Sequence, residues 1–488
     1  MSLAQKAARG ALWTIATSIG GRVIGVLGTL IMTRFMAPDA IGEVSVATII
    51  AMTANWASIW GFGPYAIVKS QKPEDAREVM WHCTVAYLVL GVIGLGGVAL
   101  FGGPLTALFD APTAARFVPG AALAIFIRRF SSVAERALVR EMRFREIGIA
   151  LAIGELTYTI TALTLAANEW GGMAIIVGNL VQATVTSGLI IRASGMKSWA
   201  TPTPLRKERF RDMLRFGLPL AVESVAHNGS RYWDNLLMAR YFGPSVTGVY
   251  NMAYNLADIP AIQVGEQIAS VLLPSMSKLE PARRPRALER STALLSLLIF
   301  PMAIGLGLIA QPLIELVLPS DKWQEVAPLL TILAVLSVFR PITWVLSVYM
   351  DAQERTMRLM LLEVAKIILL MIGIAVFSPW GVRASAAAVG LAFGVSAIAG
   401  VGMVAGDGVS LARLVRGFFE PLAACALMCG AVLAVRYGVP SFEQLHPGAK
   451  VAIEIGLGGI VYSGAALLLC RATAKDLLGL LRGAMKKS

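Results

Sequence analysis

Long apolar segments follow one another along almost the whole chain, and no other feature constrains the fold as strongly. A helix needs about 20 apolar residues to cross the hydrocarbon core of a bilayer. The chain offers fourteen candidates: 11–32, 41–66, 79–101, 117–134, 147–167, 171–191, 212–238, 245–275, 291–318, 325–349, 359–378, 382–405, 415–436 and 449–470. The fourth, seventh, eighth and tenth are interrupted by charged residues, so context contributes to their assignment. We predict an all-α polytopic membrane protein with about 14 transmembrane helices.

The charged residues agree with this class and predict an orientation. Only 15% of the residues are charged, against roughly 25% in soluble domains, which excludes a water-soluble fold. Lys and Arg number 43 and Asp and Glu number 30, a net charge of +13. With a cytoplasmic N-terminus, the loops on that side carry 29 Lys and Arg and the opposite loops carry 7. Because cytoplasmic loops retain positive charge, we predict cytoplasmic N- and C-termini and no nucleic-acid partner.

A repeated motif relates two parts of the chain. Residues 30–44 read LIMTRFMAPDAIGEV, and residues 236–250 read LLMARYFGPSVTGVY. Alignment pairs Arg34 with Arg240, Pro38 with Pro244 and Gly42 with Gly248. Both copies close one apolar segment and open the next. Membrane proteins built from two related halves are commonly alternating-access transporters with a site between the halves.

The longest loop predicts where the halves are joined. It covers residues 192–211, contains Pro202 and Pro204, and follows the sixth apolar segment. We therefore predict an N-lobe at 1–200 with helices 1–6 and a C-lobe at 201–405 with helices 7–12. Residues 406–488 would add helices 13 and 14 and a cytoplasmic tail. No loop is long enough for a separate soluble domain.

Ionisable side chains inside apolar segments are the candidate functional residues, because charge in hydrocarbon is costly without water or a partner. The seventh segment carries Glu223, His227, Arg231 and Asp234 at i, i+4, i+8 and i+11. This spacing places all four on one face of a helix. We interpret the face as the wall of a water-filled lumen. The alternative is a self-neutralising ladder that only joins helices.

The eighth and first segments carry similar residues. In the eighth, Asn251, Asn255, Asp258 and Glu266 fall on one face, although Pro260 disturbs the phase. In the first segment, a lone arginine about halfway along requires an anion or a carboxylate partner; it is Arg22.

The fourth segment continues into a basic stripe. Arg129, Arg136, Arg140 and Arg143 follow at helical spacing toward the predicted cytoplasmic side. Two interpretations stay open: a helix end against anionic lipid headgroups, or a cationic approach path for an anionic cargo headgroup.

Other intramembrane charges are isolated. Glu155, Arg340 and Glu454 have no patterned partner, and we interpret them as lumenal or snorkelling side chains. Glu363 and Lys366 stand at i, i+3, which predicts an internal salt bridge.

No catalytic or metal-binding pattern is present in the sequence. The three histidines and four cysteines lack ligand spacing, and no phosphate-binding glycine motif occurs. We expect no enzyme activity and no cofactor, and we expect energy from a proton or sodium gradient or from cargo consumption. The membrane carboxylates that could accept a coupling proton are Glu223, Asp234, Asp258 and Glu266.

Residues 234–279 resemble a known family. They read DNLLMARYFGPSVTGVYNMAYNLADIPAIQVGEQIASVLLPSMSKL. They are similar to the polysaccharide transport family, the Wzx-type lipid-linked oligosaccharide flippases of the multidrug/oligosaccharidyl-lipid/polysaccharide exporter superfamily. The matching positions are Asp234, Gly243, Pro244, Gly248, Tyr250, Ala253, Leu256, Pro260, Pro274, Ser275 and Ser277. Residues 137–149, ALVREMRFREIGI, resemble the basic segment between spans four and five of these flippases. Residues 34–42 match more loosely, and Glu43-Val44 stands where the family often has Leu-Tyr.

This resemblance implies an architecture and a cargo. It implies two six-helix lobes around a central cavity lined by helices one, two, seven and eight, plus two C-terminal helices. The implied function is a flippase of the bacterial inner membrane. It would move an undecaprenyl-pyrophosphate-linked oligosaccharide repeat unit from the cytoplasmic to the periplasmic leaflet. The product would be O-antigen, capsule or exopolysaccharide, and the partners would be membrane lipids, a polymerase and the export machinery.

The resemblance also gives the polar residues roles. Arg22 and Arg231 would grip the pyrophosphate, since guanidinium donors bind phosphate oxygens bidentately. Amide and carboxylate side chains would bind sugar hydroxyls: Glu223, Asn251, Asn255 and Asp258. The full predicted substrate-binding set is Arg22, Arg129, Glu223, His227, Arg231, Asp234, Asn251, Asn255, Asp258 and Glu266.

Three alternatives stay open at this point. A multidrug cation antiporter of the same superfamily would want an acidic cavity, and the candidate residues are not decisively basic. A peptidoglycan lipid-precursor flippase would share the architecture. A membrane glycosyltransferase, polymerase or ligase is disfavoured, because such enzymes commonly need a sizeable aqueous loop.

Overall fold

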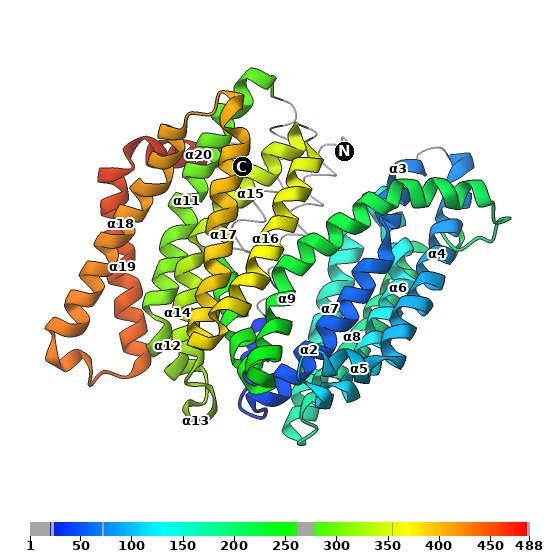
Figure 1. Ribbon diagram of the computed structural model, residues 1–488, viewed down its shortest axis with the longest axis horizontal. Coiled ribbons are helices and arrows are strands. Elements are labelled where there is room, and N and C mark those ends of the chain that lie inside the picture. The colour runs from blue at the N-terminus through cyan, green and yellow to red at the C-terminus, as the bar shows by residue number, and fades with distance from the viewer. Residues whose placement is uncertain are drawn as a thin grey trace. The chain divides into compact units, whose positions relative to one another are not determined.

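The chain forms two compact helical units in the computed structural model (Figure 1). The structure describes residues 20, 24–70, 73–260, 276, 279–353 and 355–485, and these contain no β-strand. The units are Met1–Gly248 and Val249–Ser488. The division falls inside a long helix rather than in the loop at 192–211, and the predicted lobe boundaries stay a prediction.

The first unit is built on packed long helices. Its helices are α2 (Pro38–Ile59), α3 (Phe62–Lys69), α4 (Pro73–Leu100), α5 (Gly102–Ala107), η1 (Pro112–Phe117), α6 (Val118–Arg140), α7 (Phe144–Ala167), α8 (Gly172–Ser194), η2 (Met196–Ser198) and most of α9 (Lys207–Pro260). α2, α4, α6 and α8 pack against one another, and α7 pairs with α8. The core between them includes Leu95, Phe117 and Ile176, whose burial holds these helices together.

The second unit contains the end of α9 and the remaining helices. These are η4 (Pro281–Arg283), α11 (Arg284–Leu308), α12 (Ala310–Val317), α13 (Ser320–Trp323), α14 (Val326–Leu336), η5 (Ser337–Phe339), α15 (Arg340–Ala352), α16 (Thr356–Phe377), η6 (Ser378–Trp380), α17 (Val382–Val404), η7 (Ala405–Asp407), α18 (Leu411–Gly438), η8 (Pro440–Phe442), α19 (Pro447–Leu469) and α20 (Arg471–Met485). α16 pairs with α17 and α18 with α19, while α11 contacts α14, α15 and α18.

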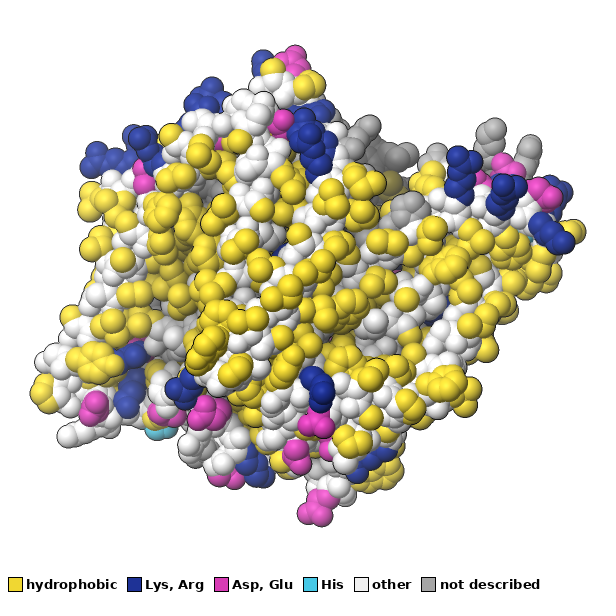
Figure 2. Space-filling view, viewed as in Figure 1, with side chains coloured by type: hydrophobic (Ala, Val, Ile, Leu, Met, Phe, Trp, Pro, Cys, Tyr) yellow, Lys and Arg dark blue, Asp and Glu magenta, His cyan; other side chains and the backbone are white. Residues whose placement is uncertain are grey.

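Eleven helical segments among the described residues are long and apolar enough to cross a membrane. They correspond to eleven of the fourteen predicted spans. Several present large apolar side chains outward, such as Ile398 on α17 and Ile460 on α19. Hydrophobic side chains accordingly cover much of the visible face between charged helix ends (Figure 2). The chain is therefore a multi-pass α-helical membrane protein, and the count of fourteen stays a prediction.

The three spans without a counterpart are the first, seventh and eighth. Residues 1–19, 21–23 and 261–275 lie outside the described part of the chain, which removes most of the first span and the end of the eighth. The seventh predicted span lies in α9, which is long enough to cross a membrane but too polar to count among the apolar spans. These are the spans in which the sequence predicted polar faces.

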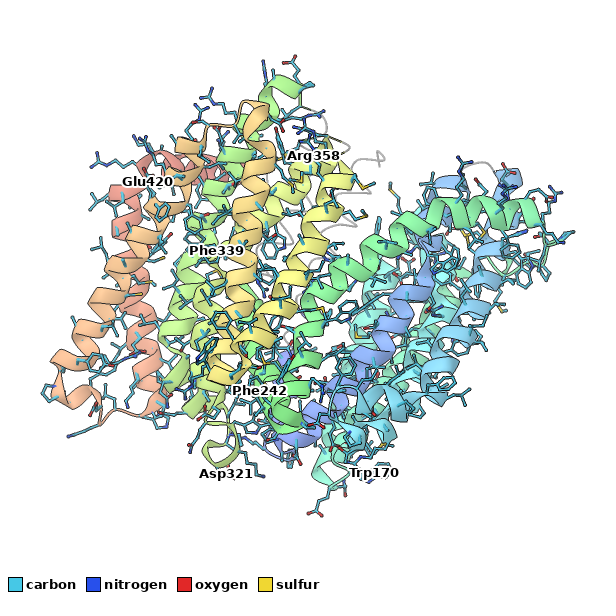
Figure 3. All side chains as sticks on the ribbon, in the orientation of Figure 1. Trp170, Phe242, Asp321, Phe339, Arg358 and Glu420 are labelled. Atoms are coloured by element: carbon cyan, nitrogen blue, oxygen red, sulfur yellow. The ribbon has the colours of Figure 1, made fainter. Side chains whose placement is uncertain are left out.

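Both copies of the repeat place a proline at the start of a helical segment. Pro38 occupies the first turn of α2 after Ala37, whose backbone is extended. In the second copy, α9 is kinked at Gly243, just after Phe242 (Figure 3), with φ 81° and ψ 172°. Glycine tolerates this conformation and proline favours a helix's first turn, so Pro244 restarts the helix. The feature that the two copies share is therefore a proline at the start of a helical segment.

Candidate functional site

The polar face of α9 is graded in burial along the helix. His227 is exposed, Arg231 is half-buried and Asp234 is fully buried. The Asn235 backbone N–H and side-chain amide donate to Asp234 Oδ1 at 2.8 and 3.0 Å. The Glu223 side chain lies outside the described residues, although its backbone is helical. Packing therefore buries the Asp234 end of the predicted face and leaves His227 exposed.

Two aromatic side chains of α9 fix that burial. The Trp233 Nε1–H donates to Thr53 Oγ1 of α2 at 3.0 Å. The Tyr232 ring stacks on Trp56 of α2 with centroids 5.5 Å apart. These contacts set the rotation of α9 about its axis, and so determine which side chains of its polar face are exposed.

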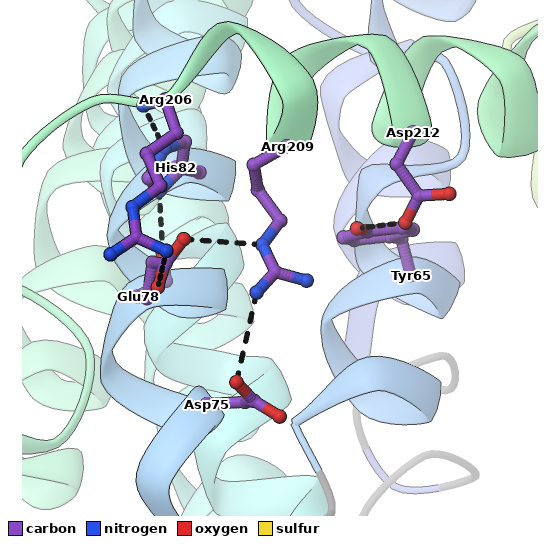
Figure 4. Close-up of polar contacts among 7 residues, drawn as sticks. All are labelled: Tyr65, Asp75, Glu78, His82, Arg206, Arg209 and Asp212. Carbon is purple, nitrogen blue, oxygen red and sulfur yellow. Dashed lines mark hydrogen bonds and ion pairs between the residues drawn. The ribbon is translucent and has the colours of Figure 1, made fainter.

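The start of α9 is tied to α3 and α4 by a polar cluster (Figure 4). The Tyr65 hydroxyl donates to Asp212 Oδ2 at 2.6 Å. Arg209 Nε donates to Glu78 Oε1 at 3.3 Å, and its Nη2 lies 3.7 Å from Asp75 Oδ1. Burial opposes the charge of Arg209, but its hydrogen bonds to Tyr65 and Glu78 outweigh burial and raise its pKa. The polar helix is therefore anchored at its N-terminal end.

His82 joins the same cluster through both ring nitrogens. Its Nδ1 lies 2.7 Å from the carbonyl oxygen of Glu78, which can only accept a hydrogen bond. Its Nε2 accepts the backbone N–H of Arg206 at 2.9 Å. The arrangement therefore requires a neutral ring with its proton on Nδ1. No sequence pattern predicts this cluster, because His82 and Arg206 are 124 positions apart.

The polar face near the end of α9 belongs to the second unit. Asn255 is exposed, and its Nδ2 donates to Asn251 Oδ1 at 2.9 Å. Asp258 is only 4% exposed and forms an ion pair with Arg340 at the start of α15. Arg340 Nη2 also donates to the Tyr254 hydroxyl at 3.0 Å. Asp258 is thus paired with a cation, while Asn255 is exposed and Asn251 is half-buried.

The sequence did not predict the partner of Arg340. It stands where the short η5 interrupts the tenth predicted span and a new helix begins. The signal was available, since Arg340 and Pro341 stand side by side inside an apolar segment and proline favours a helix start. Glu266, predicted on the same face as Asp258, lies outside the described residues.

The predicted salt bridge between Glu363 and Lys366 is confirmed, with Lys366 Nζ 2.7 Å from Glu363 Oε2. The Phe393 ring of α17 links this salt bridge to the Asp258–Arg340 ion pair. Arg340 Cζ and Lys366 Nζ each lie 5.1 Å from the centroid of the ring. Cations are attracted to the face of an aromatic ring. The second unit therefore holds a charge-balanced cluster across α9, α15, α16 and α17.

Arg129 of α6 is 3% exposed and lies inside the first unit. Its guanidinium donates to Asn55 Oδ1, the Asn55 carbonyl, Ser58 Oγ and the Tyr87 carbonyl at 2.6–3.1 Å. These contacts tie α6 to α2 and α4, which favours a packing role over cargo contact. Arg22, the other predicted intramembrane arginine of this unit, lies outside the described residues.

The basic stripe that continues from Arg129 is largely engaged within the protein. Arg140 Nη1 donates to the Ser70 carbonyl at 3.1 Å. Arg143 Nε donates to Glu146 Oε1 at 3.1 Å, and this hydrogen bond raises the pKa of Arg143 despite some burial. Arg136 is half-buried. Neither interpretation of the stripe, lipid contact or cargo path, is tested by these contacts.

The remaining isolated charges have different surroundings. Arg436 of α18 pairs with Glu454 of α19 at 2.8 Å. Glu155 of α7 accepts a hydrogen bond from Gln182 Nε2 at 2.8 Å. Within the described residues, no three His, Cys, Asp or Glu side chains are grouped to hold a metal ion, and all four cysteines are free thiols.

Comparisons with known proteins point in one direction. A family described as "Polysaccharide biosynthesis protein" matches residues 31–328. The succinoglycan biosynthesis transport protein ExoT of Rhizobium meliloti (strain 1021) is 27% identical over 66% of this chain and 66% of its own length. The lipopolysaccharide biosynthesis protein WzxC of Escherichia coli (strain K12) is 23% identical over 70% of this chain and 69% of its own length.

A solved structure gives the fold. The lipid II flippase MurJ in an inward closed conformation superposes with a TM-score of 0.80 and 14% identity. The superposition covers 96% of this chain and 100% of that one. This likeness is one of fold alone, and it extends beyond the family match to the C-terminal helices.

Proposed function

Because this chain belongs to the polysaccharide biosynthesis protein family, we propose that it is a flippase for an undecaprenyl-pyrophosphate-linked oligosaccharide repeat unit. The unit would move from the cytoplasmic to the periplasmic leaflet for O-antigen, capsule or exopolysaccharide synthesis. The observation that carries the proposal is the family match over residues 31–328, which includes the whole polar face of α9. Relatives named for succinoglycan transport and lipopolysaccharide biosynthesis support it. Membership in this family also supports a transport protein rather than an enzyme.

The physical problem of such a cargo is its pyrophosphate, which cannot enter hydrocarbon without losing its hydration. Arg231 is the described arginine best suited to bind it, because it lies half-buried on a polar face next to exposed His227. Arg22 would add a second guanidinium. Asn251 and Asn255 would hydrogen-bond sugar hydroxyls through accessible amides. The prenyl tail would stay in lipid throughout.

The proposed architecture has fourteen helices, in two six-helix lobes around a central cavity and two C-terminal helices. The eleven apolar spans support it, as do three further predicted spans whose polarity suits cavity walls. Both termini would be cytoplasmic in the bacterial inner membrane, which the loop count of 29 against 7 basic residues supports. The cargo, membrane lipids, a polymerase and export machinery would be the partners.

The test is complementation of a bacterial strain that lacks its own oligosaccharide flippase and supplies the cargo. Wild type should restore surface polymer, and Arg231→Ala should reduce it at least tenfold while the protein stays folded and inserted. Arg383→Ala is the matched control, since Arg383 is exposed and pairs with exposed Glu325 at the surface. Accumulation of lipid-linked oligosaccharide in the cytoplasmic leaflet should accompany the loss. Full activity of Arg231→Ala would remove Arg231 from the site.

The same experiment separates the rival cargoes. Wild-type protein that fails to restore polymer but rescues cells depleted of their lipid II flippase would be a peptidoglycan-precursor flippase. Protein that does neither but lowers drug susceptibility in a pump-deficient host would be a drug antiporter. Either result would overturn the proposed cargo.

A further inference from the structure

Glu155 places a carboxylate at the middle of an apolar helix. It is the twelfth of the 24 residues of α7, Phe144–Ala167, and this helix is one of the candidate membrane spans. Its side chain is half-buried in the first unit. A carboxylate at mid-span is costly and is retained where it serves a function.

Glu155 forms no ion pair with the described residues, unlike three deep carboxylates of the second unit. Ion pairs neutralise the carboxylates of the second unit: Asp258 with Arg340, Glu363 with Lys366 and Glu454 with Arg436. Glu155 forms no ion pair with any Lys, Arg or His in the described parts of the chain, and its one polar partner is Gln182 of α8. A buried carboxylate without a cation is the kind of group that gains a proton readily.

The described charged groups on the neighbouring helices do not form ion pairs with Glu155. On α7 itself the nearest titratable side chain is Tyr158, which packs against Gly178 of α8. α6 contributes Arg129, whose guanidinium is occupied by Asn55, Ser58 and Tyr87. The remaining ionisable groups of α6 and α8 are not paired with Glu155: Arg128, Glu135, Arg136, Arg140 and Arg192. Arg22, in the first predicted span, lies outside the described residues.

The partner of Glu155 can serve either protonation state. Gln182 Nε2 donates to Glu155 Oε2 at 2.8 Å, which suits a carboxylate. A side-chain amide also has an acceptor oxygen, so a rotated Gln182 can accept the O–H of a carboxylic acid. Thr159 lies one turn beyond Glu155 on α7 and Thr186 one turn beyond Gln182 on α8, and neither buried hydroxyl has a hydrogen-bond partner among the described residues. Gln182 of α8 therefore offers this carboxyl group both a donor and an acceptor.

The same carboxyl lies against residues 24–32, the described end of the first predicted span. A Cβ atom at Gly25 would lie 2.5 Å from Glu155 Oε1, and one at Gly28 would lie 2.7 Å from a methyl group of Thr159. The two glycines therefore let the backbone of the first helix approach α7 at the carboxyl. A change in the charge of Glu155 acts directly on this contact, on a helix predicted to line the cargo path.

From this geometry we propose that Glu155 is the proton-binding site that couples translocation to a proton gradient. The proposal rests on the proposed flippase function for its coupling part, and on the contacts of Glu155 alone for its proton-binding part. One proton adds to the carboxylate from one side of the membrane and leaves to the other, and no bond to the cargo forms. The sequence analysis named other carboxylates for this role, of which Asp258 is neutralised by Arg340.

The proton-binding part is tested without cargo. Infrared difference spectra of the full-length protein in lipid nanodiscs, recorded between alkaline and acid pH, report carboxyl groups that gain protons. Glu155→Gln should lose a carboxylic-acid band that wild type shows, and Glu155→Asp should keep one. Glu363→Gln and Glu454→Gln are matched controls that should leave the band unchanged, because those carboxylates are ion-paired. A Glu155→Gln spectrum identical to wild type would overturn the proposal.

A second measurement uses the unaltered protein, so it does not depend on a variant that folds. Dicyclohexylcarbodiimide labels protonated carboxyl groups in apolar surroundings. Mass spectrometry of labelled wild type should find modification at Glu155 that increases several-fold as pH falls, with little at Glu363 or Glu454. Absence of label at Glu155 across the pH range would overturn the proposal.

The coupling part is tested in proteoliposomes with lipid-linked oligosaccharide and an imposed pH gradient. Wild-type translocation should accelerate several-fold with the gradient, and Glu155→Gln translocation should not respond to it. A response retained in Glu155→Gln would overturn the coupling role. Failure of wild type to move any oligosaccharide would instead contradict the proposed function. The infrared and labelling experiments would still decide whether Glu155 binds a proton.

Discussion

Gly42 of α2 and Gly248 of α9 lie against each other with no room for a side chain between them. A Cβ atom at Gly42 would overlap the carbonyl oxygen of Pro244, and one at Gly248 would overlap the carbonyl oxygen of Pro38. The same two atoms would lie 2.9 and 3.1 Å from the backbone nitrogen of the opposite glycine. All four residues belong to the sequence repeat, so its two copies contact each other reciprocally within the first unit.

Gly42→Ala and Gly248→Ala should therefore each force the two helix starts apart. Overpacking of this kind costs about 1–3 kcal/mol in the free energy of unfolding, and a lower thermal midpoint in detergent should report it. Gly97→Ala on α4 is the control, because a Cβ there meets nothing within 4 Å. It should be neutral or slightly stabilising. Equal midpoints for Gly42→Ala and Gly97→Ala would mean that the repeat contact is not tight.

The sequence predicted this contact only in part. Pro38 and Pro244, and Gly42 and Gly248, were paired by alignment, and their common role as helix starts follows from proline's fixed geometry. That the copies touch could not be predicted, because nothing in a repeat states how its copies pack. The eleven apolar spans were predictable for the opposite reason, since each crosses hydrocarbon independently of its neighbours.

Breaking the Asp258–Arg340 pair should destabilise the second unit more than removing it altogether. Asp258→Asn or Arg340→Gln alone leaves one buried charge without its ion pair, at a cost of about 3–5 kcal/mol. The double variant leaves none, so its thermal midpoint should lie above that of either single variant. Strictly additive losses would show that the two side chains do not interact energetically.

Local spacing predicted some polar contacts and not others. Glu363 and Lys366 are one helical turn apart, so helix geometry alone brings them together. Arg340 and Asp258, and Arg209 and Glu78, come from distant parts of the chain, and only tertiary packing joins them. The candidate site is therefore predictable as faces of single helices, and not as pairs between helices.

Thiol labelling should follow the burial gradient along α9. In a background without Cys83, Cys425, Cys429 and Cys470, His227→Cys should react with a water-borne maleimide, since His227 is exposed. Asp234→Cys should stay unreactive until the protein is denatured, since Asp234 is fully buried. Labelling at 227 from either side of the membrane would support an aqueous chamber. If position 227 were labelled from neither side of the membrane, the result would contradict an aqueous chamber and weaken the flippase proposal.

The anchor of α9 should loosen when one hydroxyl is removed. Tyr65→Phe deletes the hydrogen bonds of its hydroxyl to Asp212 and Arg209, each worth about 1 kcal/mol. Hydrogen exchange in residues 207–215 should then become faster, while exchange in α2 stays as in wild type. Tyr437→Phe is the control, because Tyr437 is exposed and lies on α18 of the second unit. Unchanged exchange in Tyr65→Phe would assign the anchoring to Arg209 and His82 alone.

Arg129→Lys tests whether Arg129 acts through its positive charge or through the several hydrogen-bond donors of its guanidinium. Arg129→Lys keeps the positive charge, but a single ammonium cannot reach Asn55, Ser58 and the Tyr87 carbonyl together. Each buried acceptor left without a donor costs about 1–3 kcal/mol, so the thermal midpoint should fall clearly. Arg128→Lys, one residue earlier and half-buried, should change it little. If Arg129→Lys kept wild-type stability but lost activity, Arg129 would bind cargo as the sequence predicted. If activity falls only as stability falls, it holds α2, α4 and α6 together.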